Sequence, residues 1–236
     1  MKTTKKLNIW TIVHSSACLL FGFIMLYTGR TPVPPFLTAI VPCYGIVIFA
    51  LLFTIYRRGV LRLPNFISLV RLFFGAAALV MIRFHPPAFI ILTLLAVAAL
   101  SDTFDGLAAR ALGATDFGAK LDMELDAFFM FLLSAVLYYI GMEGWVLTPG
   151  LIRYGYVFVL LALPPAAPLK GAVLRYQKLV CLFSYLLLVA AVAPWITMRV
   201  RVFLVLVDIL LLGSSFLLDL VFRLVSLKGP VGEKRL

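Results

Sequence analysis

Six of the ten acidic residues in this 236-residue chain fall in the short stretch 101–127. Four of them keep helical spacing: Asp102 and Asp105 are three residues apart, and Asp122 and Asp126 are four apart. Residues spaced in this way share one face of a helix. Two such faces joined by a short turn would bring four carboxylates together. Carboxylate oxygens without His or Cys favour hard cations such as Mg²⁺ or Mn²⁺, so the spacing predicts a site for one or two divalent ions.

Cations held in this way commonly bind phosphates, and a pair of them can neutralise a pyrophosphate during displacement. A carboxylate left partly free could take a proton from an attacking hydroxyl. Gly106 and Gly118 lack side chains and would let a ligand approach closely, and Arg110 adds a fixed cation. The competing interpretation is a salt-bridged cluster that only sets helix packing. It is disfavoured because nearby cations are too few to neutralise the acids.

The composition is that of an integral membrane protein. The chain is 64% hydrophobic with a mean hydropathy of +1.10, whereas soluble domains are about half apolar. The formal net charge is +11, but the basic residues lie in short connections between apolar segments. This distribution follows the positive-inside rule and attraction to anionic lipid, so we expect membrane lipids as partners and no nucleic acid.

About 20 apolar residues are needed to cross a bilayer. We therefore predict an all-α membrane protein of about eight transmembrane helices, near residues 8–28, 36–56, 66–84, 88–111, 116–142, 151–168, 177–196 and 200–224. Basic residues concentrate before the first helix, in every second connection and after the last helix. This alternation predicts that both termini and the acidic cluster lie on the cytoplasmic side, and we expect a prokaryotic cytoplasmic membrane.

The acidic cluster carries a specific pattern of residue types and spacings. It resembles the signature of the CDP-alcohol phosphotransferase family, in the form Asp102-x2-Asp105-Gly106-x2-Ala109-Arg110…Gly118-x3-Asp122-x3-Asp126. Members of that family move a phospho-group from a CDP-linked donor to an alcohol and release CMP. Seven residues separate Arg110 from Gly118, where the usual pattern has eight. The difference falls in the connecting turn.

A second match lies upstream, where Asn65-x2-Ser68-x2-Arg71 resembles the Asn-x2-Thr-x2-Arg at the start of the family's first core helix. The family has a six-helix core. The resemblance therefore implies two extra N-terminal transmembrane helices in 1–62, a catalytic membrane core in 63–225 and a basic cytoplasmic tail in 226–236.

The resemblance also implies roles for single residues. Asp102, Asp105, Asp122 and Asp126 would hold two Mg²⁺ or Mn²⁺ ions, and Asp126 would also be the base that activates the acceptor hydroxyl. A second group would shape the pocket for the CDP nucleotide, namely Gly106, Ala109, Arg110 and Gly118. Candidate substrate-binding residues are Asn65, Ser68 and Arg71. A homodimer is implied in the same way.

The leading hypothesis is phospholipid synthesis, in which CDP-diacylglycerol donates a phosphatidyl group to a small polar alcohol. In one alternative the headgroup and not the lipid carries the CDP, so that CDP-choline or CDP-ethanolamine donates to a lipid alcohol. An alternative of another class is a cation transporter that uses the aspartates as an ion site. In family members with glycerol-phosphate acceptors a Lys often follows the last Asp. Ala127 stands there, which disfavours that acceptor and leaves serine, inositol, inositol phosphate and choline open.

Several charged residues outside the signature have competing interpretations. A predicted cytoplasmic loop holds Lys170, Arg175 and Lys178, which either bind a substrate phosphate or serve topology and lipid anchoring. Arg153 is expected near the opposite membrane face. For Asp208 and Asp219 in the last helix we expect hydrogen bonds between helices rather than catalysis.

Overall fold

The computed structural model describes residues 2–29, 40–41, 43–47, 50, 63–112, 116–163 and 171–228. Side chains are not described for residues 2–8, 63–66, 68–69, 102–121, 172 and 226–228. The described elements are α1 (Lys2–Thr28), α3 (Leu63–Met81), η1 (Ile82–Phe84), α4 (Ala88–Leu112), α5 (Asp116–Tyr139), η2 (Gly144–Leu147), α6 (Thr148–Leu161), α7 (Gly171–Val192) and α8 (Met198–Lys228). The described residues form helices and connections without a strand, which confirms the all-α prediction.

Four described segments are long and apolar enough to cross a membrane: Ile9–Thr28, Gly144–Leu161, Val173–Val192 and Met198–Val225. The helices α3, α4 and α5 have 19, 25 and 24 residues. At about 1.5 Å per residue, they match the roughly 30 Å hydrocarbon core of a bilayer. The chain is therefore an integral membrane protein. The predicted helix at 36–56 lies largely outside the described residues.

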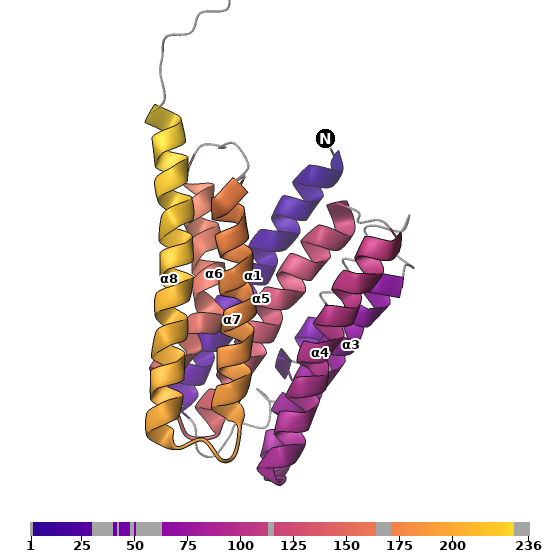
Figure 1. Ribbon diagram of the computed structural model, residues 1–236, viewed down its shortest axis with the longest axis vertical. Helices are drawn as coiled ribbons and strands as arrows, with labels where there is room; N and C mark the ends of the chain where they lie inside the picture. The colour runs from indigo at the N-terminus through magenta and orange to yellow at the C-terminus, as the bar shows by residue number, and fades with distance from the viewer. Residues whose placement is uncertain are drawn as a thin grey trace, which may run out of the picture.

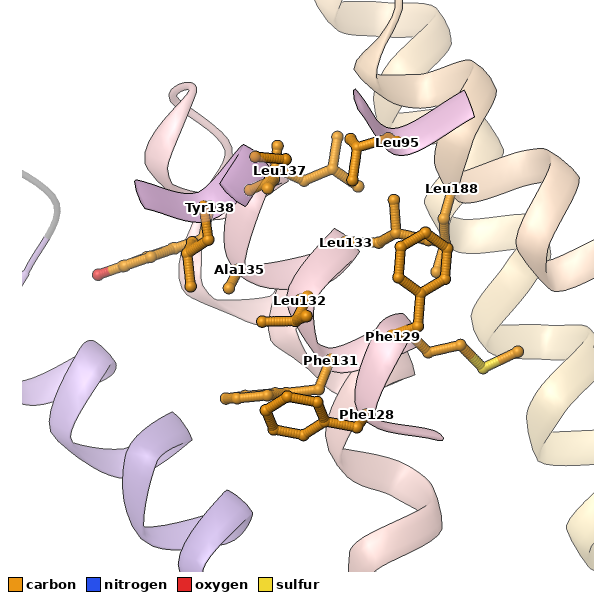
Figure 2. Close-up of a cluster of buried hydrophobic side chains, with 14 of the residues drawn as sticks. Leu95, Phe128, Phe129, Phe131, Leu132, Leu133, Ala135, Leu137, Tyr138 and Leu188 are labelled. Carbon is orange, nitrogen blue, oxygen red and sulfur yellow. The ribbon is translucent and has the colours of Figure 1, made fainter. Parts of the chain in front are cut away.

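Helix α5 is the centre of the bundle. From Glu124 to Tyr139 every residue except Asp126 is buried, as expected for a helix that is apolar on all sides. It packs against α3, α6 and α7, while α3 pairs with α4 and α7 pairs with α8. Figure 2 shows its side chains projecting in several directions, with Leu95 of α4 and Leu188 of α7 among the surrounding residues. The helix that carries Asp122 and Asp126 is thus enclosed by other helices from Glu124 to Tyr139.

Local signals explain where the helices end. Gly141 has a φ of 119°, the Met142 amide donates to the Leu137 carbonyl at 3.1 Å, and the Gly141 amide donates to the Tyr138 carbonyl at 3.3 Å. These bonds form a Schellman motif that ends α5 at Tyr139 rather than at the predicted residue 142.

The predicted boundaries of the sixth and seventh helices were also wrong. Helix α6 ends at Leu161, shortly before Pro164 and Pro165, and it begins early because Pro149 fits the first turn of a helix. Helix α7 begins at Gly171, six residues before the predicted start. Consequently Arg175 and Lys178 lie in the first turns of α7 and not in a loop.

The two ends of the bundle hold different connections (Figure 1). The N-terminus, the facing ends of α4 and α5, the start of α7 and the end of α8 lie at one end, called here the acidic end. The connections from α3 to α4, from α5 to α6 and from α7 to α8 lie at the other end. This grouping is the one that the alternation of basic residues predicts.

Helix α1 is built into the bundle through α5 and α6. The Tyr138 hydroxyl donates to the Met25 carbonyl at 3.1 Å, and Gly22 brings α1 so near to Leu151 of α6 that an added Cβ would lie 2.5 Å from that side chain. His14 is fully buried, and its ring lies 5.5 Å from the ring of Tyr154. His14 is therefore a core residue.

Candidate active site

The acidic residues lie on two continuous helices, as their spacing predicted. Asp122 and Asp126 are one turn apart on α5, and the backbone of α4 runs unbroken through Asp102 and Asp105. Gly106, Ala109 and Arg110 follow on α4, and Gly118 lies in the first turn of α5. The side chains of residues 102–121 are outside the described part, so only Asp122 and Asp126 can be placed in atomic detail.

Arg71 of α3 lies directly against these two aspartates. Its side chain is 1% exposed, whereas those of Asp122 and Asp126 are 46% and 22% exposed. The Nη2 atom lies 3.3 Å from Oδ1 of Asp122, and Nη1 forms an ion pair with Oδ1 of Asp126. A buried guanidinium offers five donors in a fixed plane, so it can hold two carboxylates at once. The predicted substrate-binding residue thus contacts the acidic site itself.

The two residues grouped with Arg71 in the sequence share its helix. Asn65 and Ser68 precede it at three-residue intervals on α3, which places all three on one face of the helix. Their side chains are outside the described part.

Tyr185 of α7 also belongs to the described part of the site. Its hydroxyl lies 3.0 Å from Oδ1 of Asp126 and 3.2 Å from the Asp126 carbonyl, as a donor to both. Nη1 of Arg71 donates to the same hydroxyl at 3.4 Å. The ring of Tyr185 stacks on that of Phe129, with centroids 5.3 Å apart. The sequence did not reveal this residue, since it lies in an apolar run with no motif, and only counting helical turns from the acidic end could have suggested its depth.

The two described carboxylates fit a hard divalent cation. They are oxygen donors on one helix face, and both remain partly exposed. Among the side chains that the structure describes, no group of three or more His, Cys, Asp or Glu converges. A complete ligand set would therefore need Asp102 and Asp105.

The remaining candidates lie outside this contact network. Arg175 and Lys178 are exposed on α7, at the acidic end of the bundle, and Lys170 is outside the described residues. A surface hollow of about 440 Å³ lies at the opposite end, lined by residues of the α5–α6 connection and by Met198 and Val202 of α8. It is remote from Asp122 and Asp126 and is no candidate for their ligand.

The expectation that Arg153 lies near the opposite membrane face was wrong. Its Nη2 atom lies 3.0 Å from Oε1 of Glu124, whose side chain is completely buried. Glu124 lies between Asp122 and Asp126 in sequence, and a helix turns about 100° per residue. Its side chain therefore points away from theirs and is paired on the other side of α5.

The acids of α8 confirm the expected hydrogen bonds between helices. The Tyr156 hydroxyl of α6 donates to Oδ2 of Asp219 at 2.6 Å, and Nε of Arg223 lies 3.0 Å from the same oxygen. The Ser184 hydroxyl of α7 donates to Oδ1 of Asp208.

Together these features define an all-α integral membrane protein with a charged site at one end of its central helix. The family model of CDP-alcohol phosphatidyltransferases matches residues 61–213, which is more than half of the chain, and the protein belongs to this family. The match spans α3 to α7 and the first part of α8, and α1 precedes it. Comparison with curated proteins and with solved structures gave no match. The family consists of transferases of phosphate-containing groups.

Proposed function

We propose that the protein transfers a phosphatidyl group from CDP-diacylglycerol to the hydroxyl of a small polar alcohol and releases CMP. The observation that carries the proposal is the convergence of Asp122 and Asp126 with the buried Arg71, in a chain of this family. Family membership also weighs against the alternative of a cation transporter.

The proposed reaction has one displacement at phosphorus. The hydroxyl oxygen of the acceptor forms a bond to the β-phosphorus of the donor, and the bond from that phosphorus to the bridging oxygen breaks. The bridging oxygen and its electron pair leave with CMP. The hydroxyl proton passes to Asp126, whose carboxylate is 22% exposed and can be reached.

Asp102, Asp105, Asp122 and Asp126 would hold Mg²⁺ or Mn²⁺. A bound ion would supply neutralisation of the pyrophosphate and of the leaving group. Arg71 is already committed to Asp122 and Asp126, so its role is to compensate and orient these carboxylates. Arg175 and Lys178 are exposed at the acidic end, where either could bind a phosphate of donor or acceptor.

The test is a comparison of donors with the purified protein in lipid nanodiscs. One arm contains CDP-diacylglycerol, Mg²⁺ or Mn²⁺, and a pool of serine, inositol, inositol phosphate and choline. The other contains CDP-choline and CDP-ethanolamine with diacylglycerol. Release of CMP is measured in both, and mass spectrometry of the lipid names the product. CMP in the first arm supports the proposal. CMP in the second arm alone overturns the donor assignment, and CMP in neither overturns the proposal.

A further inference from the structure

Two neighbouring residues of α7 direct their hydroxyls to acids on two different helices. Tyr185 donates to Asp126 of α5, and Ser184 donates to Asp208 of α8. Adjacent residues on a helix point about 100° apart, so a single rotation of α7 must satisfy both contacts. Both hydroxyl-bearing residues are buried.

The hydrogen bonds at Tyr185 have a consistent direction. Arg71 donates to the hydroxyl oxygen at 3.4 Å, and the hydroxyl donates to Oδ1 of Asp126 at 3.0 Å. The Tyr185 hydroxyl therefore accepts a hydrogen bond from the Arg71 guanidinium and donates one to the Asp126 carboxylate. Stacking on Phe129, at an interplanar angle of 23°, fixes the plane of the ring that carries this hydroxyl.

Asp208 of α8 is the acid that accepts the hydrogen bond of Ser184. It is 0% exposed within a membrane-spanning helix, where an acid is costly, and the proposed reaction gives it no task. The Asp208 carboxylate accepts a hydrogen bond from the hydroxyl of Ser184, the residue next to Tyr185. This bond connects α8 with α7 and restricts the rotation of α7 about its own axis.

We propose that Tyr185 is a positioning residue for Asp126, and that the contact between Ser184 and Asp208 sets the rotation of α7 that directs it. This proposal rests on the proposed function, because the orientation of the Asp126 carboxylate matters only if Asp126 acts as the base. A carboxylate turns about two side-chain torsions, and a base acts on a bound hydroxyl in only one orientation. Displacements of about 1 Å at such a site can cost about 100-fold in rate.

The first variant is Tyr185→Phe, which removes the hydroxyl and keeps the ring on Phe129. The matched control is Tyr138→Phe, which also loses one buried hydroxyl bond, to the Met25 carbonyl, but at the opposite end of α5. Three quantities are measured for each variant: kcat for CMP release, KM for the CDP donor, and the dissociation constant of CDP.

We expect kcat of Tyr185→Phe to fall at least about tenfold, within the range seen when a supporting contact of a site is removed. KM and CDP affinity should stay within about twofold of the wild type, since the hydroxyl holds the base and not the nucleotide. Tyr138→Phe should keep kcat. A purely structural role would lower stability equally in both variants without this selective loss of kcat.

Ser184→Ala tests the second half of the proposal and carries the whole test if Tyr185→Phe does not fold. It should lower kcat while CDP affinity is kept, and wild-type kcat would overturn the role of Asp208. Wild-type kcat in Tyr185→Phe, with Asp126→Asn inactive, would overturn the positioning role and leave the proposed function intact. If the wild type itself released no CMP from any donor, the proposed function would fail instead.

Discussion

Glu124 and Arg153 form an ion pair of 3.0 Å inside the helix bundle, on the side of α5 away from the acidic site. The glutamate is completely buried, and the arginine is 23% exposed. Helix α6 is thereby connected to the segment of α5 that carries Asp122 and Asp126. The pair fixes the position of α5 without taking part in the proposed reaction.

Removing one member of this pair should destabilise the protein. Arg153→Met would remove the guanidinium that lies 3.0 Å from the buried Glu124 carboxylate, and breaking a buried ion pair costs about 3–5 kcal/mol. Unfolding in detergent should therefore occur at a clearly lower Tm. The double variant Glu124→Gln with Arg153→Met should recover much of the loss, because it removes the buried negative charge together with its cation. An unchanged Tm in Arg153→Met would contradict this account.

Replacing Arg71 by lysine should impair the reaction even though the charge is kept. A planar guanidinium reaches Asp122 and Asp126 together, whereas an ammonium is a single compact charge. We expect CMP release by Arg71→Lys to fall at least about tenfold, as for other residues that support a site. Arg83→Lys is the matched control, since Arg83 is exposed just beyond the other end of α3. Equal rates of CMP release for the two variants would show that the planar guanidinium of Arg71 is not required.

The close approach of α5 and α6 should make Gly150 intolerant of a side chain. A Cβ at this position would lie 2.5 Å from Cα of Phe131 and 3.1 Å from the carbonyl oxygen of Met130, so the backbone would have to move. Overpacking of this kind costs about 1–3 kcal/mol, and Gly150→Ala should lower Tm. Gly155 lies on the same helix with no neighbour within 4 Å.

The matched control Gly155→Ala should therefore be neutral or stabilising, by up to about 1 kcal/mol from helix propensity alone. The result that would disprove the close packing is an equal Tm for the two variants.

Binding of Mn²⁺ should depend on Asp122. Removal of divalent cations with EDTA should abolish CMP release, and Mg²⁺ or Mn²⁺ should restore it. Electron paramagnetic resonance of Mn²⁺ should show weaker binding to Asp122→Asn, because an amide oxygen replaces an anionic donor. Glu143→Gln, at an exposed acid in the α5–α6 connection, should bind as the wild type does. Mn²⁺ bound equally by Asp122→Asn would remove Asp122 from the ligand set.

The sequence predicted those parts of the fold and site that depend on local patterns. Apolar length predicted the helices that the structure describes, and the three- and four-residue intervals predicted that Asp102 and Asp105 lie on one continuous helix and Asp122 and Asp126 on another. These predictions succeed because helical spacing determines which residues share a face.

Contacts between distant helices could not be predicted in the same way. Tyr185 meets Asp126 across 59 residues, and an apolar membrane helix carries little periodic signal to show which side faces the bundle. Arg153 was expected near the opposite membrane face, because it stands near the start of the predicted helix at 151–168. The pairing with Glu124 depends on the packing of α6 against α5 and on the length of the arginine side chain, which the sequence does not encode locally.

The most direct test of the central claim is the release of CMP from CDP-diacylglycerol by the wild type and by Asp126→Asn, with Mg²⁺ and the pooled alcohols present. Asn has nearly the same shape as Asp but cannot accept the proton. We expect metal-dependent release by the wild type and a fall of about 10²–10⁴-fold in the variant. Equal release by both proteins would contradict the assignment of Asp126 as the base and, with it, the proposed mechanism.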